Sequence, residues 1–287
     1  MLRLSSSTRP ALLSMRVELF LCVLPLAAPF AHRPSTRVRA PCMRPRRTPR
    51  EALLVPATET GAGLLAATGL LAWVAPEANL PGFRDYDSTA AAVVRTIGAW
   101  QIVLAVALLA SAAEPAVAAG RTMYAAAITE MCVIPVKDAQ LKCPRWVKGL
   151  MAGASLAAAA LGKLTLGGAV SPTVAAAALT VIGGRVYVAP TSSIAARFDA
   201  PASDLAVSLL SLYGAVIAMS GIALVGQVVG LSRPRCTALV LVAYSLVSLR
   251  WAAAEATALE TPKIGPLATV AVTALLSGVA LRAQVHV

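Results

Sequence analysis

The sequence predicts an all-α integral membrane protein with about eight transmembrane helices, arranged as two parallel four-helix repeats. Three observations lead to this fold class. The 287 residues are 58% hydrophobic and only 13% charged, and the mean hydropathy of +0.75 lies outside the range of ordinary soluble domains. Long apolar runs recur along the chain, and the loops between them repeat at a near-constant distance.

The second half of the chain repeats loop residues of the first half. Val-Ala-Pro closes an apolar run at residues 74–76 and again at 188–190. Phe-Arg-Asp follows at 83–85, and Arg-Phe-Asp follows at 197–199. Apolar residues match by chance easily, whereas polar loop residues at a near-constant offset do not. We therefore predict that one module occurs twice.

Residues 1–50 form a predicted targeting presequence, lost on import. They hold ten Arg and one acid, Glu18, so they carry +9 of the net charge of +12. The apolar run 19–31 fits the core of a signal peptide, and the Arg-rich, acid-free stretch 33–50 has transit-peptide composition. Because the basicity belongs to this segment, it does not indicate a nucleic-acid partner.

This two-part presequence, with Phe30 near the junction, resembles the bipartite plastid presequence of algae with complex plastids. The resemblance implies a plastid membrane, thylakoid or envelope, as the location. Two alternatives stay open. The Arg- and Ser-rich start over residues 1–16 also fits a mitochondrial presequence, which would lead to the inner membrane, and the apolar core alone fits the secretory pathway.

After the presequence, eight apolar runs approach the roughly 20 residues that a helix needs to cross a bilayer core of about 30 Å. The first is the shortest. Four runs fall in the first module, residues 51–170, and four in the second, residues 171–287, so both copies have the same orientation in the membrane. The predicted spans are Gly61–Pro76, Thr89–Ala113, Ala116–Pro135, Val147–Ala169, Thr173–Pro190, Ser203–Gly230, Cys236–Ala256 and Ile264–Ala283.

Histidine and cysteine patterns exclude several kinds of chemistry. Histidine occurs only at His32, in the presequence, and at His286, so His-box di-iron sites and haem with an axial His are excluded. The five cysteines show no CxxC pair or other metal-binding spacing. The sequence therefore predicts no metal site and no cofactor, and it assigns no catalytic residue.

Four ionisable residues near membrane depth make up the candidate ligand site: Arg95, Glu130, Arg250 and Glu255. Charge in hydrocarbon costs roughly 2.5–3.5 kcal/mol on insertion scales, so such residues usually pair or face a cavity. We predict a polar pocket between the third spans of the two modules, suited to an anionic or amphipathic small molecule. In the alternative interpretation these residues mark helix ends and extend their charges to the headgroups.

The pattern of a span ending in Val-x-Pro, a short acidic loop and then Arg95-x-x-Gly98-x-x-Gln101 resembles the DoxX-like four-helix membrane proteins. The resemblance covers nearly all of residues 61–283 as two copies. The second copy departs from it, with Leu210 or Ser211 at the position of the Arg. The resemblance implies a fold and no particular activity.

Three functions fit these observations. The leading hypothesis is a non-catalytic scaffold or assembly component, whose partners are membrane lipid and other membrane proteins and not nucleic acid. It would organise other proteins through helix faces of small residues, such as the run Ala157–Ala160, which allow close helix contacts. The second hypothesis is a carrier of a small hydrophobic or anionic solute. The third is a membrane enzyme acting on a lipid or isoprenoid.

Overall fold

The structure, a computed structural model, describes residues 51–79, 87–137, 153, 171–192, 203–255, 259 and 264–282. All the regular elements in these residues are helical, which confirms the predicted all-α class. The presequence and the predicted span Val147–Ala169 lie outside the described residues, apart from residue 153. The helices are α3 (Glu51–Val74), α4 (Ser88–Ala110), α5 (Pro115–Lys137), α7 (Pro172–Val188), α9 (Asp204–Val228), α10 (Arg233–Arg250) and α12 (Ile264–Arg282).

Each of these helices coincides with a predicted apolar run, with shifted ends. The largest shift is at α3, which begins at Glu51, ten residues before the predicted Gly61. The short 3-10 helix η3, Pro76–Asn79, follows α3 after one residue. The last helical turn after α10 is a π turn, η4, over Trp251–Glu255.

Within the residues that the structure describes, three helical segments are long and apolar enough to cross a membrane: Ser88–Ala110, Asp204–Val228 and Arg233–Ala254. Two shorter apolar helical segments, Pro172–Val188 and Leu267–Val279, accompany them. These lengths and compositions are those of a helical membrane protein.

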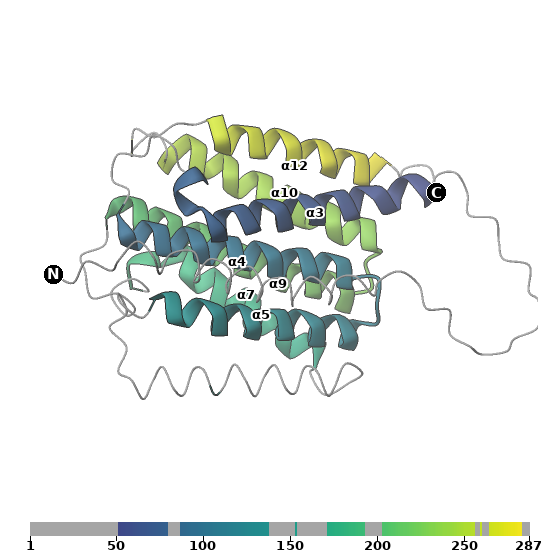
Figure 1. The fold of residues 1–287 in the computed structure, drawn as a ribbon. Coiled ribbons are helices and arrows are strands. Elements are labelled where there is room, and N and C mark those ends of the chain that lie inside the picture. Colours follow the sequence, from purple (N-terminus) through teal and green to yellow (C-terminus); the bar gives the residue numbers. More distant parts are fainter. Residues whose placement is uncertain are drawn as a thin grey trace, which may run out of the picture.

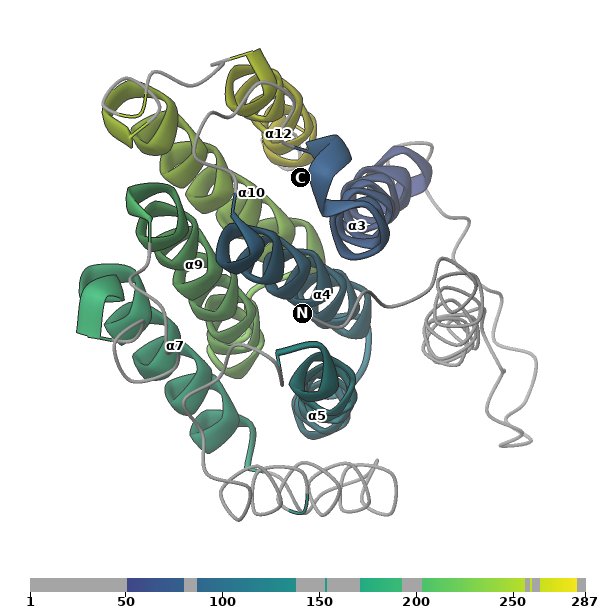
Figure 2. The same ribbon diagram turned by 60° about the vertical axis from the view of Figure 1, so that its left-hand side comes forward.

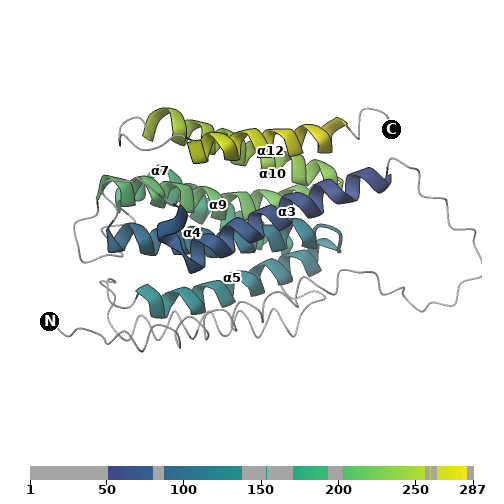
Figure 3. The same cartoon turned by 45° about the horizontal axis from the view of Figure 1, so that its top comes forward.

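α4 and α9 lie side by side at the centre of the bundle (Figures 1 and 2). α3 and α5 pack against α4, whereas α7 and α10 pack against α9. α12 lies on the outside, against α10 and α3 (Figure 3). Most residues of the two central helices are buried, and one continuous apolar cluster joins α3, α4, α5, α7, α9 and α10.

Glycine pairs set the distance between neighbouring helices in both halves of the chain. On α3 and α4, a Cβ added to Gly69 would lie 2.5 Å from the carbonyl oxygen of Gly98. On α7 and α9, a Cβ added to Gly183 would lie 2.6 Å from the carbonyl oxygen of Gly214. In membranes, such small residues let helix backbones approach closely and pack through van der Waals contact.

Helix ends and internal hydroxyl groups satisfy their hydrogen bonds locally. The Asp87 side chain accepts a bond from the Ala90 N–H at 2.6 Å and caps α4. Gly230, at φ +77°, ends α9, where the Leu231 N–H donates to the Gly226 carbonyl at 2.8 Å. Hydroxyl groups inside the helices donate to the carbonyl four residues earlier, as Ser220 does to Val216 at 3.1 Å. Such internal pairing is what an apolar surrounding requires.

Large apolar side chains cover the outward faces of the outer helices. Val181 on α7 is 69% exposed, and Leu275 on α12 is 70% exposed. Leu246 on α10 is similarly open, at 62%. Monomeric soluble proteins rarely expose apolar surface of this extent, whereas lipid tails or partner helices would cover it.

Candidate functional site

Arg95 lies two turns into α4, and its side chain is 24% exposed. It pairs with Glu77 on η3, whose carboxylate oxygen lies 4.0 Å from the guanidinium. Nε of Arg95 is buried and has no hydrogen-bond partner. Because Glu77 is itself 66% exposed, this is a loose ion pair at the end of the bundle, of a kind that contributes little stability.

Arg250 is the last residue of α10 and lies on the surface. Its guanidinium donates a hydrogen bond to the Tyr187 hydroxyl on α7. Its Cζ also lies 5.1 Å from the centroid of the Tyr187 ring, in a cation–π arrangement. These two contacts join the ends of α7 and α10.

The other two candidate residues are placed only by their backbones. Glu130 lies in the second half of α5, and Glu255 is the last residue of the π turn η4. Their side chains lie outside the described part of the structure. The common pocket therefore stays a prediction.

All four candidate residues lie toward the same end of the bundle. Gln227, near the end of α9, donates to the carbonyl of Ala107, near the end of α4, at 3.5 Å, so these central helices run in parallel. Trp251, after α10, donates through Nε1 to Ser208, near the start of α9, at 2.8 Å. The start of α4, with Arg95, and the end of α10, with Arg250, therefore share one end. The two cations nevertheless contact different partners, Glu77 and Tyr187.

The sequence did not single out the polar contact between Gln101 and Tyr244. Gln101 on α4 donates through Nε2 to the Tyr244 hydroxyl on α10 at 2.6 Å. Its Oε1 is buried and has no hydrogen-bond partner. The available signal was a glutamine within an otherwise apolar span, in the pattern Arg95-x-x-Gly98-x-x-Gln101. Ser208 carried no such signal, because a serine hydroxyl in a helix commonly bonds its own backbone. Tyr187 carried none either, because a tyrosine near the end of a span fits plain interfacial anchoring.

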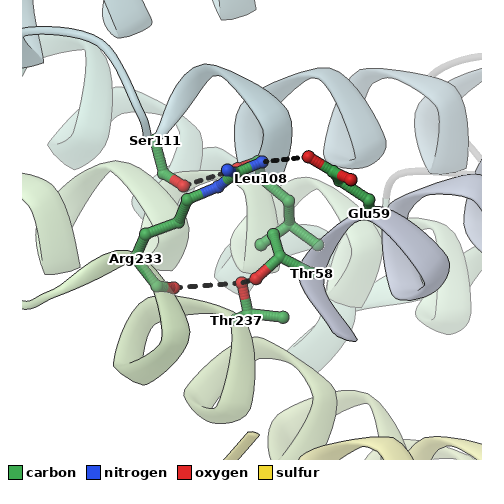
Figure 4. A network of polar contacts seen from close by, with 6 residues as sticks. All are labelled: Thr58, Glu59, Leu108, Ser111, Arg233 and Thr237. Atoms are coloured by element: carbon green, nitrogen blue, oxygen red, sulfur yellow. Dashed lines mark hydrogen bonds and ion pairs between the residues drawn. The ribbon is translucent and has the colours of Figure 1, made fainter. Parts of the chain in front are cut away.

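A second polar cluster lies at the opposite end, where α3 and α10 begin and α4 ends (Figure 4). The hydroxyls of Thr58 and Thr237 lie 3.1 Å apart. Arg233 extends toward Glu59, with an N–O distance of 3.9 Å. Ser111, just after α4, bonds back to the Leu108 carbonyl at 2.5 Å. The first two contacts join the starts of α3 and α10, whereas the Ser111 bond closes the end of α4 on itself.

Among the residues that the structure describes, no three His, Cys, Asp or Glu side chains lie close enough together to hold a metal ion. Cys236 is buried near Gly226, where α9 turns into α10, and its Sγ lies 3.7 Å from the Leu231 carbonyl oxygen. It therefore fills space between two helices.

The fold and these contacts define the class as an all-helical protein with helices suited to a membrane. No family model, curated protein or solved structure matches the chain.

Proposed function

We propose that the chain is a non-catalytic scaffold or assembly component of an organellar membrane. One observation carries this proposal: polar side chains inside the bundle form hydrogen bonds between helices. Each of the following pairs joins one helix to another. The pairs are Gln101–Tyr244 (α4 to α10), Gln227–Ala107 (α9 to α4), Trp251–Ser208 (η4 to α9), Ser245–Thr273 (α10 to α12) and Thr58–Thr237 (α3 to α10). Polar groups committed to helix contacts support a structural role.

The proposal includes two copies of a DoxX-like four-helix module. Gly183 follows Gly69 by 114 positions, Gly214 follows Gly98 by 116, and both pairs make the same kind of backbone contact. The neighbours also correspond, because a Cβ on Gly98 would lie 2.9 Å from the Trp73 nitrogen while Gly214 faces the Tyr187 nitrogen, 114 positions later. This correspondence supports the duplication and, with it, eight spans.

Partners of a scaffold would contact the outward apolar faces. The small-residue contacts around Gly69 and Gly183 are already used within the chain. The faces left for other proteins or lipid are those with large exposed side chains, such as Val181 and Leu275. Association would then rest on packing of these side chains in the membrane.

The proposed location is a plastid membrane, thylakoid or envelope, reached after loss of residues 1–50. The Arg-rich transit composition of 33–50 supports this location. A mitochondrial inner membrane or a secretory-pathway membrane is the alternative. Fusion of residues 1–50 to a fluorescent protein tests it, and import into an organelle other than the plastid would overturn this part.

Native mass spectrometry of the tagged protein, extracted gently from its own membrane, tests the scaffold proposal. We expect proteins to co-purify in fixed stoichiometry. The triple variant Arg95→Met, Glu130→Leu, Arg250→Met should keep these partners, since a scaffold does not need the three charges. A bound small molecule other than a phospholipid, found without protein partners and lost in the triple variant, would contradict the proposal.

A carrier of a small hydrophobic or anionic solute is the second candidate. Gln101 and Gln227 each leave a buried amide oxygen without a hydrogen-bond partner, at the contact of the central helices with their neighbours. Polar groups inside a membrane bundle often mark solute pathways. If the protein transports a small hydrophobic or anionic solute into vesicles, and Gln101→Leu abolishes this transport, the result would favour the carrier. A membrane enzyme acting on a lipid or isoprenoid, the third hypothesis, has no comparable observation in its favour.

A further inference from the structure

Tyr187 holds the Arg250 guanidinium in one orientation at the surface. The ring lies under the guanidinium, with 5.1 Å from Cζ to the centroid, and the hydroxyl accepts a hydrogen bond from Nη1. An exposed Arg normally loses much of its side-chain entropy when it is ordered for binding. A guanidinium that is already stacked and bonded has lost much of this freedom before a ligand arrives.

Exposed apolar side chains lie next to this pair on both helices. Val188, the residue after Tyr187, is 80% exposed, and Leu249, the residue before Arg250, is 46% exposed. Leu246, one turn earlier on α10, continues the apolar surface away from the helix end. Acyl chains lying along this surface would bring their headgroup to the level of the guanidinium.

The surroundings keep the pair in place. The Trp251 indole, next to Arg250, is buried and bonded to Ser208 at 2.8 Å, which fixes the end of α10 against α9. A planar cation held in this way suits an anion with several oxygen atoms.

We propose that Arg250 and Tyr187 form a binding site for the phosphate group of an anionic phospholipid. The planar fork of the guanidinium matches phosphate oxygens and can bind two of them together, which a lysine ammonium cannot do. The acyl chains lie on the apolar surface of Leu246 and Leu249. The site does not depend on the scaffold role, because it would equally anchor a carrier in the membrane.

The test measures lipid retention by native mass spectrometry after equilibration of the full chain with vesicles of phosphatidylglycerol or of phosphatidylcholine. Wild type should retain phosphatidylglycerol preferentially. In Arg250→Gln, retention should fall about tenfold, the factor expected for loss of a charge-assisted hydrogen-bonded contact. Arg235→Gln is the matched control, since Arg235 is an exposed Arg at the opposite end of the same helix, and it should retain the lipid as wild type does.

Conservative variants show whether lipid binding depends on the orientation of the guanidinium or only on its charge. Arg250→Lys keeps the charge and loses the fork, so it should bind more weakly than wild type. Tyr187→Leu removes both contacts and should also weaken binding, and Tyr187→Phe should have an intermediate effect. If Arg250→Gln does not fold, Arg250→Lys and Tyr187→Leu decide the question.

Three results would overturn the site. The first is equal retention by Arg250→Gln and Arg235→Gln. The second is equal retention of the two lipids by wild type. The third is complete displacement of phosphatidylglycerol by millimolar inorganic phosphate, which would identify free phosphate, and not a lipid, as the ligand.

Discussion

Gly183 of α7 and Gly214 of α9 meet backbone to backbone. A methyl group on Gly183 would lie 2.6 Å from the Gly214 carbonyl oxygen, and one on Gly214 would lie 2.7 Å from the Gly183 carbonyl oxygen. A second close contact on the same two helices lies at Gly221, where a Cβ would lie 2.6 Å from the Thr180 nitrogen. Neither backbone can move aside without separating the helices, so this pair of glycines sets their distance.

Replacing Gly183 by alanine should separate α7 from α9. We expect Gly183→Ala to lower the free energy of unfolding by about 1–3 kcal/mol, the usual effect of overpacking a tight contact. Gly184→Ala is the control on the next residue, because a Cβ there meets nothing within 4 Å. Thermal unfolding in detergent measures both variants. Equal stability of the two would show that the close contact does not govern packing.

The corresponding contact in the first half should respond in the same way. Gly69→Ala should destabilise the protein by a similar amount, because its Cβ would lie 2.5 Å from the Gly98 carbonyl oxygen. Gly63→Ala, on the same helix and with open space around it, should not. Matching losses for Gly69→Ala and Gly183→Ala would support the duplicated module. A neutral Gly69→Ala would argue against equivalent roles.

Gln101 and Tyr244 should be energetically coupled. Gln101→Leu and Tyr244→Phe each leave one buried polar group without its partner, whereas the double variant removes both. The double variant should therefore lose less stability than the sum of the two, with a coupling of about 0.6 kcal/mol, the average for such bonds in membranes. A double-mutant cycle of unfolding in mixed micelles measures this, and a coupling of zero would show that the hydrogen bond is not stabilising.

The Arg95–Glu77 pair should contribute little to stability. Its charges lie 4.0 Å apart and Glu77 is largely exposed, so we expect Glu77→Gln to change the free energy of unfolding by less than about 0.5 kcal/mol. Arg95→Met should be neutral or slightly stabilising, because it removes a buried Nε that has no partner. Chemical unfolding of both variants tests this. A loss of more than about 2 kcal/mol in either would indicate a stronger interaction than the distance implies.

Cysteine labelling should locate α10 in the membrane. In a variant whose mature-chain cysteines are replaced by alanine, Ser232→Cys, at the exposed turn before α10, should react with a membrane-impermeant maleimide in open membranes. Leu246→Cys should not, because lipid covers this outward side chain in the bilayer. Leu246→Cys should become reactive in detergent-denatured protein, which serves as the control. Rapid labelling of Leu246→Cys in intact bilayers would contradict a membrane span over this helix.

Helix positions could be predicted because they depend on local properties of the chain. Apolar runs of sufficient length favour helices in a membrane. The helices α4, α7 and α9 begin after the polar capping residues Asp87, Ser171 and Ser203. The prediction placed the start of α3 too late. Residues 51–60 contain Glu and Thr among the apolar residues, so the hydropathy signal begins only after the helix has begun. The number of membrane spans and the repeat stay predictions.

The sequence by itself determined the helical class, the approximate helix ranges and charged residues that need partners, Arg95 and Arg250 among them. Only the tertiary structure decided which partners these have, Glu77 for Arg95 and Tyr187 for Arg250, and only it revealed the contact of Gln101 with Tyr244. The physical reason is the distance along the chain over which each interaction acts. Hydropathy and capping act within a few residues, whereas the partner of a buried polar group depends on which helix faces it. That choice follows from close backbone contacts, such as Gly183 against Gly214, between residues far apart in the chain.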